Sequence, residues 1–125
     1  MPYVINPGEV DSWEVHEGIH GKVMADGKNM TALWTSWAPK TVFSVHTHPH
    51  EQIGVCLQGE AIFTIEGQDY VVKKGDVYHI PPNAPHAERN EGEEPAVFLE
   101  CFAPVRDELL RKKFEQKIVG KNPGS

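Results

Sequence analysis

The stretch His-Thr-His-Pro-His-Glu-Gln, residues 46–52, lies between two runs of β-forming residues and decides how the chain is interpreted. Side chains at positions i and i+2 of a strand point to the same face, so His46 and His48 can reach one point. Imidazole is the commonest metal ligand in proteins. A further histidine, His86, follows a proline-rich segment. This pattern predicts a metal site, whereas one histidine alone would indicate only a surface turn.

Gln52 and Glu51 compete for the role of a fourth ligand. Strict alternation along a strand places residues 46, 48, 50 and 52 on one face and Glu51 on the opposite face. This periodicity favours Gln52. Pro49 can shift the register by one residue, however, so Glu51 stays open as the alternative.

Glycine and proline separate short apolar runs throughout the chain, with 11 glycines and 10 prolines in 125 residues. This texture is typical of an all-β sandwich or barrel. We expect strands over residues 13–16, 22–25, 30–38, 42–48, 52–57, 60–66, 70–73, 77–80 and 96–102. Residues 66–69 predict a hairpin turn. Residues 106–119 lack glycine and proline and repeat apolar side chains every four positions, which predicts a C-terminal amphipathic helix.

The composition bounds the class of protein. The net charge is −6 and the basic residues form no long tract, so we expect no nucleic-acid partner. No apolar run is long enough to span a membrane. The first residues lack the basic flank and apolar core of a signal peptide, so we expect a cytoplasmic protein. Cys56 and Cys101 lie in apolar runs without a Cys-x-x-Cys pattern, which favours buried free thiols.

Two segments around the histidines share the spacing of known motifs. The pattern Gly-x5-His-x-His-x(3,4)-Glu-x6-Gly is matched by His46, His48, Gln52 and Gly59. The pattern Gly-x5-Pro-x-Gly-x2-His-x3-Asn is matched by Gly75, Pro81, Asn83, His86 and Asn90. The chain therefore resembles the cupins, metalloproteins built on a double-stranded β-helix, or jelly-roll barrel. The resemblance implies one domain over residues 1–125, with the barrel core at about 30–104.

Three positions depart from these motifs. Lys40 and Asn83 stand where the motifs have glycine, and asparagine also tolerates a positive φ. Gln52 stands where the first motif has glutamate. The ligand set His46, His48, Gln52 and His86 is then entirely neutral, so a bound ion would keep its full charge and attract anions. We expect one divalent transition metal ion from the group Ni, Zn, Mn, Fe and Co.

A narrower resemblance lies at the end of the last predicted strand. The sequence Glu-Cys-Phe-Ala-Pro-Val-Arg-Asp, residues 100–107, resembles a segment of the KdgF-type pectin-degradation cupins, which linearise 4,5-unsaturated uronates to ketouronates. The resemblance implies active-site roles for Glu100, Phe102 and Arg106. Glu100 and Phe102 share strand parity, and Arg106 can bind a carboxylate bidentately. The alternative is that Glu100 forms a structural ion pair and Phe102 is simply core.

Three classes of function remain open at this point. The first is an isomerase or lyase that acts on a small anionic sugar, which Gln52 and Arg106 favour. The second is a metal-dependent dioxygenase, and the third is a non-catalytic protein that binds a sugar or another small molecule. In each case the expected partners are a small anionic molecule and, from the cupin resemblance, a second copy of the chain in a homodimer.

Overall fold

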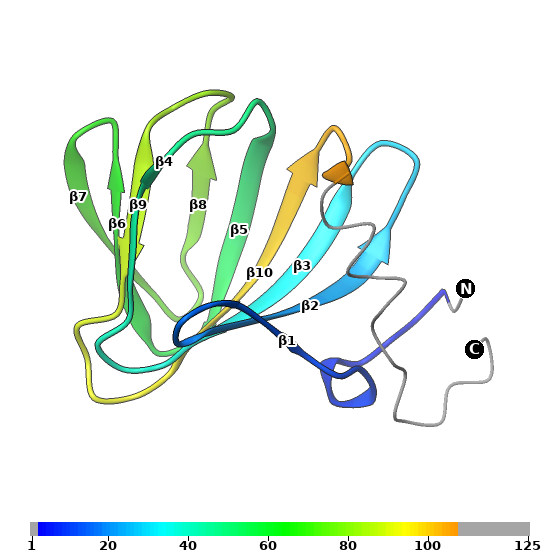
Figure 1. The fold of residues 1–125 in the computed structure, drawn as a ribbon, viewed down its shortest axis with the longest axis horizontal. Helices are drawn as coiled ribbons and strands as arrows, with labels where there is room; N and C mark the ends of the chain where they lie inside the picture. Colours follow the sequence, from blue (N-terminus) through cyan, green and yellow to red (C-terminus); the bar gives the residue numbers. More distant parts are fainter. Residues whose placement is uncertain (1–2, 108–125) are drawn as a thin grey trace.

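The computed structural model describes residues 3–107, and in this range ten strands form two antiparallel sheets that face each other (Figure 1). The strands are β1 (Trp13–His16), β2 (Ile19–Asp26), β3 (Thr31–Trp37), β4 (Val42–His46), β5 (Glu51–Gln58), β6 (Glu60–Ile65), β7 (Gln68–Lys73), β8 (Val77–Ile80), β9 (His86–Arg89) and β10 (Ala96–Ala103). A short 3-10 helix, Pro7–Glu9, precedes β1. The all-β jelly-roll fold expected from the sequence is confirmed.

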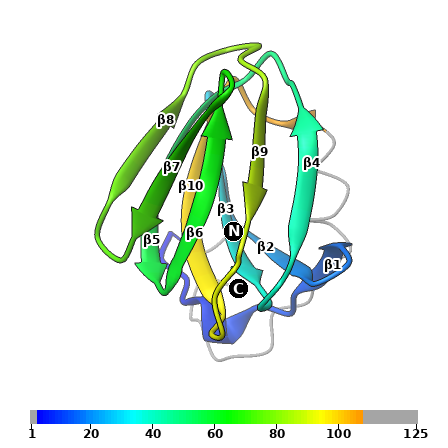
Figure 2. The same ribbon diagram turned by 90° about the vertical axis from the view of Figure 1, so that its left-hand side faces the viewer.

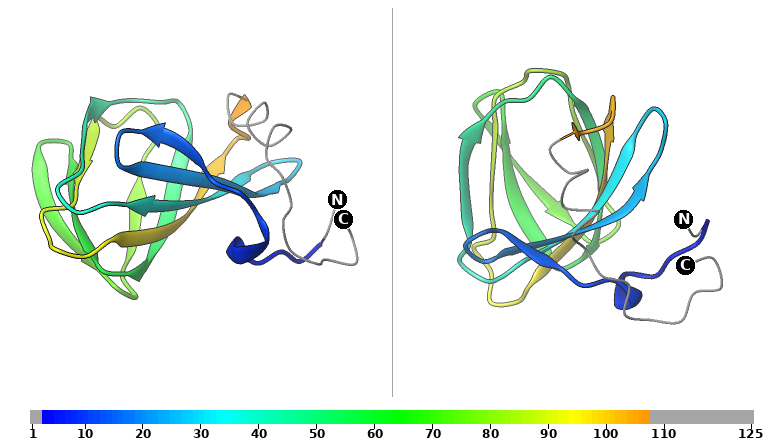
Figure 3. Two further views of the ribbon diagram at one scale, coloured as in Figure 1. Left: turned by 60° about the horizontal axis from the view of Figure 1, so that its bottom comes forward. Right: turned by 45° about the vertical axis from the view of Figure 1, so that its right-hand side comes forward.

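The two sheets have the orders β1-β2-β3-β10-β5-β8 and β4-β9-β6-β7. Figure 2 shows the four-stranded sheet from its outer side. The larger sheet extends past it, so that the β2–β3 hairpin stands clear of the remaining strands (Figure 3). The space between the sheets is therefore enclosed by β4, β9 and β6 on one side and by β3, β10 and β5 on the other.

Period-two alternation explains why these residues form sheets with one buried face. On β3 and β10 every second side chain is buried, namely Thr31, Leu33, Thr35 and Trp37 on β3 and Ala96, Phe98, Glu100 and Phe102 on β10. Phe63 on β6 and Ile80 on β8 complete the core at 1 % and 0 % exposure. Burying a side chain of this size stabilises the fold by about 1.5–3 kcal/mol. Glu100 is the one ionisable side chain among these eight buried residues of β3 and β10, and at the ordinary pKa of a glutamate it would be charged at neutral pH.

The nine predicted strands are all present, with ends that differ by at most three residues. Two details differ from the sequence-based expectation. The predicted strand 42–48 ends at His46, because a register shift between Phe43 and His46 and the following Pro49 take the chain out of the ladder. Strand β9 was not expected, because His-Ala-Glu-Arg is short and contains no β-branched residue.

Left-handed backbone conformations occur at the positions where a glycine would be the usual choice. Lys40 and Asn83, which replace motif glycines, have φ of 65° and 64°. Glu66 and Gly67 have φ of 50° and 83° and form the predicted two-residue hairpin between β6 and β7. At Asn83 this conformation lets the backbone N–H donate to the carbonyl oxygen of His48 (2.8 Å), which joins the two motif loops.

Asn90, the last residue of the second motif, organises the loops at the closed end of the barrel. Its side-chain amide donates to the carbonyl oxygens of Trp37 (3.1 Å) and Glu94 (2.8 Å), and its Oδ1 accepts from the N–H of Gly92 (2.9 Å). The residue is 1 % exposed. The bond to Trp37 is fully buried, and the other two are partly buried.

We expect Asn90→Ala to lower the free energy of unfolding by about 3 kcal/mol, since it leaves two carbonyl groups and one N–H without a partner. Urea denaturation of the metal-free protein measures the change. Asn29→Ala, at an exposed turn position, is the matched control and should change the value by less than about 0.5 kcal/mol. A loss of similar size in both variants would contradict the role assigned to Asn90.

The amphipathic helix predicted for residues 106–119 lies, apart from its first two residues, outside the described residues and stays a prediction. Within residues 3–107 no helix is long and apolar enough to cross a membrane.

Candidate metal centre

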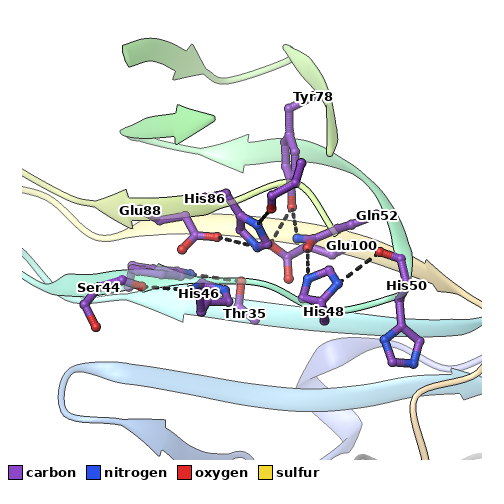
Figure 4. A network of polar contacts seen from close by, with 12 residues as sticks. Thr35, Ser44, His46, His48, His50, Gln52, Tyr78, His86, Glu88 and Glu100 are labelled. Carbon is purple, nitrogen blue, oxygen red and sulfur yellow. Dashed lines mark hydrogen bonds and ion pairs between the residues drawn. The ribbon is translucent and has the colours of Figure 1, made fainter. Parts of the chain in front are cut away.

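The histidines of the two motifs meet between the sheets. His46 is the last residue of β4, His48 lies in the β4–β5 loop, and His86 is the first residue of β9. Strands β4 and β9 are neighbours, and His46 is paired with His86 in their register. One ligand atom from each of the three histidines lies within 4.8 Å of the others (Figure 4).

The orientation of the three imidazole rings is fixed by backbone hydrogen bonds. The Nδ1 atom of each ring donates to a carbonyl oxygen: His46 to Ser44 (2.8 Å), His48 to His50 (3.0 Å) and His86 to Ala84 (2.8 Å). Because a carbonyl oxygen only accepts, the proton of each neutral ring is on Nδ1 and the lone pair on Nε2. A hydrogen bond from Nδ1–H to a backbone carbonyl oxygen, with Nε2 left free to bind, is the usual arrangement for metal-binding histidines.

Burial keeps these rings in the form that binds metal. Desolvation lowers the pKa of His86 to about 4, and desolvation together with the charge of Arg106 lowers the pKa of His48. Both rings are therefore neutral at neutral pH. His86 Nε2 is buried and has no hydrogen-bond partner. A buried nitrogen lone pair without a partner, within 4.8 Å of a ligand atom of His46 and of one of His48, fits a divalent cation.

Gln52 is brought to this cluster and Glu51 is turned away from it. The Gln52 side chain is buried, and its Oε1 lies 3.1 Å from His48 Nε2. Its Nε2 donates to the Tyr78 hydroxyl (3.1 Å), which fixes the orientation of the amide. Two acceptor atoms then face each other, an arrangement that a cation between them would stabilise. Glu51 is exposed and pairs with His79 at 2.7 Å.

Glu100 projects inward from β10 and is held by neighbouring polar groups. The Tyr78 hydroxyl donates to Glu100 Oε1 (2.5 Å), and Gln52 also hydrogen-bonds this carboxyl group. Burial raises the pKa of Glu100 to about 7, although the Tyr78 hydrogen bond and the charge of Arg106 oppose the rise. A carboxyl group with this pKa can both release and accept a proton near neutral pH.

Phe102 and Arg106 stand beside the histidines. The ring centroid of Phe102 is 5.7 Å from that of His48. The Arg106 guanidinium carbon lies 4.7 Å from the Phe102 centroid, and the Arg106 N–H donates to Thr31 Oγ1 (3.1 Å). The cation–π contact and the backbone bond position the guanidinium at the end of β10.

A cavity of about 140 Å³ joins these groups. Its polar lining comprises Thr35, His46, His48, Gln52, Glu88, Glu100 and Arg106, and its apolar wall includes Trp37, Phe43 and Phe102. The space is therefore polar at the histidines and carboxyl groups and apolar elsewhere, with three aromatic rings in the apolar part, which suits a small ligand with both polar groups and a ring face.

The sequence pattern of the family described as "Cupin domain" matches residues 33–102, more than half of the chain. The chain belongs to the cupin family. The match covers His46, His48, Gln52 and Gly59 of the first metal motif and all of the second, together with the part of β10 that carries Glu100 and Phe102.

Among similar proteins, this cupin is 29 % identical over 103 residues to the uncharacterized protein MJ1618 of Methanocaldococcus jannaschii, covering 82 % of this chain and 79 % of that protein. It is 28 % identical over 98 residues to the pectin degradation protein KdgF of Dickeya dadantii, covering 78 % and 88 %. The solved structure of KdgF from Halomonas sp. superposes with a TM-score of 0.78 at 27 % identity, covering 83 % of this chain and 94 % of that chain.

Two polar residues of the cupin site, Tyr78 and Glu88, were missed by the sequence analysis. Tyr78 is buried and lies in a row across three strands, in which Gly54 is paired with Tyr78 on β8 and with Glu100 on β10. A Cβ at Gly54 would lie 2.4 Å from the Tyr78 ring, so glycine makes room for it. The sequence signal for Glu88 was its spacing of two residues from His86.

The raised pKa of Glu100 predicts a pH-dependent difference in stability between the metal-free wild type and Glu100→Gln. The folded state holds the Glu100 proton up to about pH 7, whereas the unfolded chain releases it near 4.5. This carboxyl group thus contributes full stability below pH 4.5, and the contribution is lost as the pH rises through 7. Between pH 5 and pH 8 the wild type should lose about 2.5 kcal/mol relative to Glu100→Gln.

Urea denaturation in the presence of a chelator at both pH values measures this difference. Glu60→Gln, at an exposed position of β6, is the control and should follow the wild type. A constant difference between wild type and Glu100→Gln across the pH range would show that Glu100 titrates as an ordinary carboxyl group.

Proposed function

We propose that this cupin is a metal-dependent enzyme that converts a cyclic 4,5-unsaturated uronate to its linear keto form. The observation that carries the proposal is the shared cavity, in which Glu100 and Arg106 face the candidate metal ligands. The likeness to the two KdgF proteins, one of them described as a pectin degradation protein, supports the same chemistry.

His46, His48 and His86 would hold the ion, with Gln52 Oε1 as a fourth, neutral ligand. When bound there, a divalent ion supplies Lewis acidity to oxygen atoms of the substrate. Because all four ligands are neutral, the site retains the positive charge that favours an anionic sugar. Arg106 adds to this charge at the end of β10.

Arg106 and Phe102 would bind and orient the substrate. A guanidinium group recognises a carboxylate through two parallel hydrogen bonds, so Arg106 fixes the uronate carboxylate. The Phe102 ring, packed between Arg106 and His48, offers a flat apolar surface to one face of the sugar. Together they set the position of the ring oxygen relative to Glu100.

Glu100 would move the proton that linearisation requires. Ring opening breaks the bond between C1 and the ring oxygen, and the C1 hydroxyl loses its proton as C1 becomes an aldehyde. C5 becomes a ketone as C4 gains a proton, so the reaction is an isomerisation with no other reactant. A buried carboxyl group held by Tyr78 can accept the first proton and donate the second.

Loss of the enol-ether absorbance of an unsaturated uronate tests the proposal. Metal-loaded protein should accelerate the loss above the spontaneous background, and protein treated with a chelator should not. Absence of acceleration with Zn, Ni, Mn, Fe and Co would refute the linearisation. Oxygen uptake with a candidate substrate would then favour the dioxygenase class, and ligand binding without turnover the binding-protein class.

The fourth ligand can be assigned by comparing Gln52→Ala with Glu51→Ala. We expect Gln52→Ala to weaken zinc binding by about tenfold or more, a loss of the size seen for groups close to a metal. Glu51→Ala, which removes only the exposed partner of His79, should stay within twofold of the wild type. Competition with a zinc-binding dye measures both affinities. The reverse result would assign the fourth ligand to Glu51.

A further inference from the structure

Glu88 is a buried carboxyl group that neither the fold nor the proposed reaction uses. It lies on β9 two residues after His86, and its side chain is 6 % exposed. Its Oε2 atom is buried and has no hydrogen-bond partner, and the residue lines the same cavity as His46 and His48. Its Oε1 lies 3.9 Å from His86 Nε2, too far for a hydrogen bond.

A buried polar atom without a partner destabilises the folded state, so a carboxyl group in this position needs an explanation. Packing does not supply one, because an apolar side chain of similar shape would fill the space without the unpaired oxygen. The candidate metal ion does not supply one either. Among the residues that the structure describes, the group of ligand atoms within 4.8 Å of one another comprises three histidines and leaves Glu88 out.

Glu88 and Arg106 line the cavity from different sheets, because β9 belongs to the four-stranded sheet and Arg106 follows β10 of the six-stranded sheet. Glu88 is paired with Phe43 across β4 and β9, whereas Arg106 follows β10 and stands over Phe102. Figure 4 shows Glu88 on one side of His86, with His48 and Gln52 on the other. A ligand whose carboxylate lies at Arg106 and whose ring lies beside the histidines would thus extend towards Glu88.

We propose that Glu88 is a specificity-determining residue that hydrogen-bonds a hydroxyl group of a polyhydroxylated carboxylate. The class of ligand rests on the proposed function, while the buried Glu88 Oε2 atom without a hydrogen-bond partner is an observation in its own right. An ammonium group is the less suitable partner, because Arg106 and a metal ion would repel it from the same cavity. A neutral hydroxyl group can donate to the Glu88 oxygen without that repulsion.

Two probe molecules separate recognition of hydroxyl groups from recognition of the carboxylate. D-galacturonate carries a pyranose ring, a carboxylate and hydroxyl groups, and tetrahydropyran-2-carboxylate carries the ring and the carboxylate alone. Titration calorimetry with zinc-loaded protein measures the binding of both. The proteins are the wild type, Glu88→Gln, Glu88→Met and the control Glu60→Gln, which removes an exposed carboxylate.

We expect Glu88→Met to raise the Kd for D-galacturonate about tenfold or more, the usual effect of removing a hydrogen bond to a carboxyl group. Its Kd for tetrahydropyran-2-carboxylate should stay within twofold of the wild type. Glu88→Gln keeps one acceptor oxygen and should lie between wild type and Glu88→Met. Glu60→Gln should match the wild type with both probes.

Stability and zinc content distinguish recognition from a structural role. Removal of the unpaired carboxyl group should leave the Tm of the metal-free protein unchanged or raise it, by about 5 °C in Glu88→Met. All variants should retain the zinc content of the wild type. A fall of Tm in both Glu88 variants, or loss of zinc, would show that Glu88 supports the fold or the ligands and would overturn the proposal.

Failure of this proposal differs from failure of the proposed function. Two results would show that Glu88 does not hydrogen-bond a hydroxyl group of the ligand. One is equal binding of D-galacturonate by the wild type and Glu88→Met, and the other is a wild type that binds D-galacturonate no more tightly than tetrahydropyran-2-carboxylate. Turnover of the unsaturated uronate in that case would leave the linearisation intact. If turnover is absent but Glu88→Met still weakens D-galacturonate binding selectively, the Glu88 proposal stands and the linearisation falls.

Discussion

Zinc at a hundredfold excess over its dissociation constant is expected to stabilise the wild-type chain by about 2.7 kcal/mol and to leave a chain with His46→Ala and His48→Ala unchanged. The reason is that a ligand stabilises the folded state only through a site that the folded state possesses. The double variant keeps a single histidine of the three, and His86 alone cannot compete with water and buffer for the ion. Urea denaturation with and without zinc measures the difference.

The matched control is His79→Ala, which removes an exposed histidine that pairs with Glu51 outside the cavity. It should retain the full stabilisation by zinc and one zinc ion per chain after dialysis. If the double variant also retained one zinc ion per chain, the ion would lie elsewhere and the candidate centre would be wrong.

The strands could be predicted where the buried positions are apolar. Strand β3 alternates Leu33 and Trp37 with outward side chains, and this alternation is a local property of the sequence. Strand β9 could not be predicted in the same way, because its two inward positions are His86 and Glu88. There the chain places polar groups in the interior, so the hydrophobic pattern is lost at the site itself.

The histidines of the site could be predicted from spacing, because His46 and His48 are close in sequence and the second motif supplies His86. The remaining parts depend on strand pairing, which the local sequence does not encode. Tyr78 reaches Glu100 only because β5 lies between β8 and β10 with Gly54 in the shared row. The roles predicted for Gln52, Glu100, Phe102 and Arg106 stay predictions, although the structure places all four along one cavity.

Two positions where the motifs have glycine show how far a motif predicts backbone conformation. Spacing placed Lys40 and Asn83 at positions where a positive φ is usual, and both adopt one. The side chain of Lys40 then extends away from the barrel and pairs with Glu93 (3.1 Å). The lysine made the geometry of the first turn uncertain from sequence alone, yet the left-handed conformation is kept there as it is at Asn83.

Glu100→Gln is expected to lower kcat for linearisation by about 10²–10⁴-fold, the usual contribution of general acid–base assistance. Glutamine keeps the shape of the side chain and still accepts the hydrogen bond of Tyr78, so the network around Gln52 stays intact. It cannot accept or release a proton near neutral pH. Zinc content should therefore equal that of the wild type, and only the rate of absorbance loss should fall.

Arg106→Ala is the companion variant, because binding of the carboxylate and transfer of the proton should separate in the kinetics. If Arg106 holds the carboxylate equally in the ground state and the transition state, its loss raises KM and leaves kcat nearly unchanged. Glu100→Gln should instead lower kcat and leave KM nearly unchanged.

Equal falls in zinc content and kcat for Glu100→Gln would mean that the carboxyl group supports the metal ligands instead of the reaction. If kcat of Glu100→Gln stays within threefold of the wild type, Glu100 does not transfer the proton. The contacts of its carboxyl group with Gln52 and Tyr78 would then be structural.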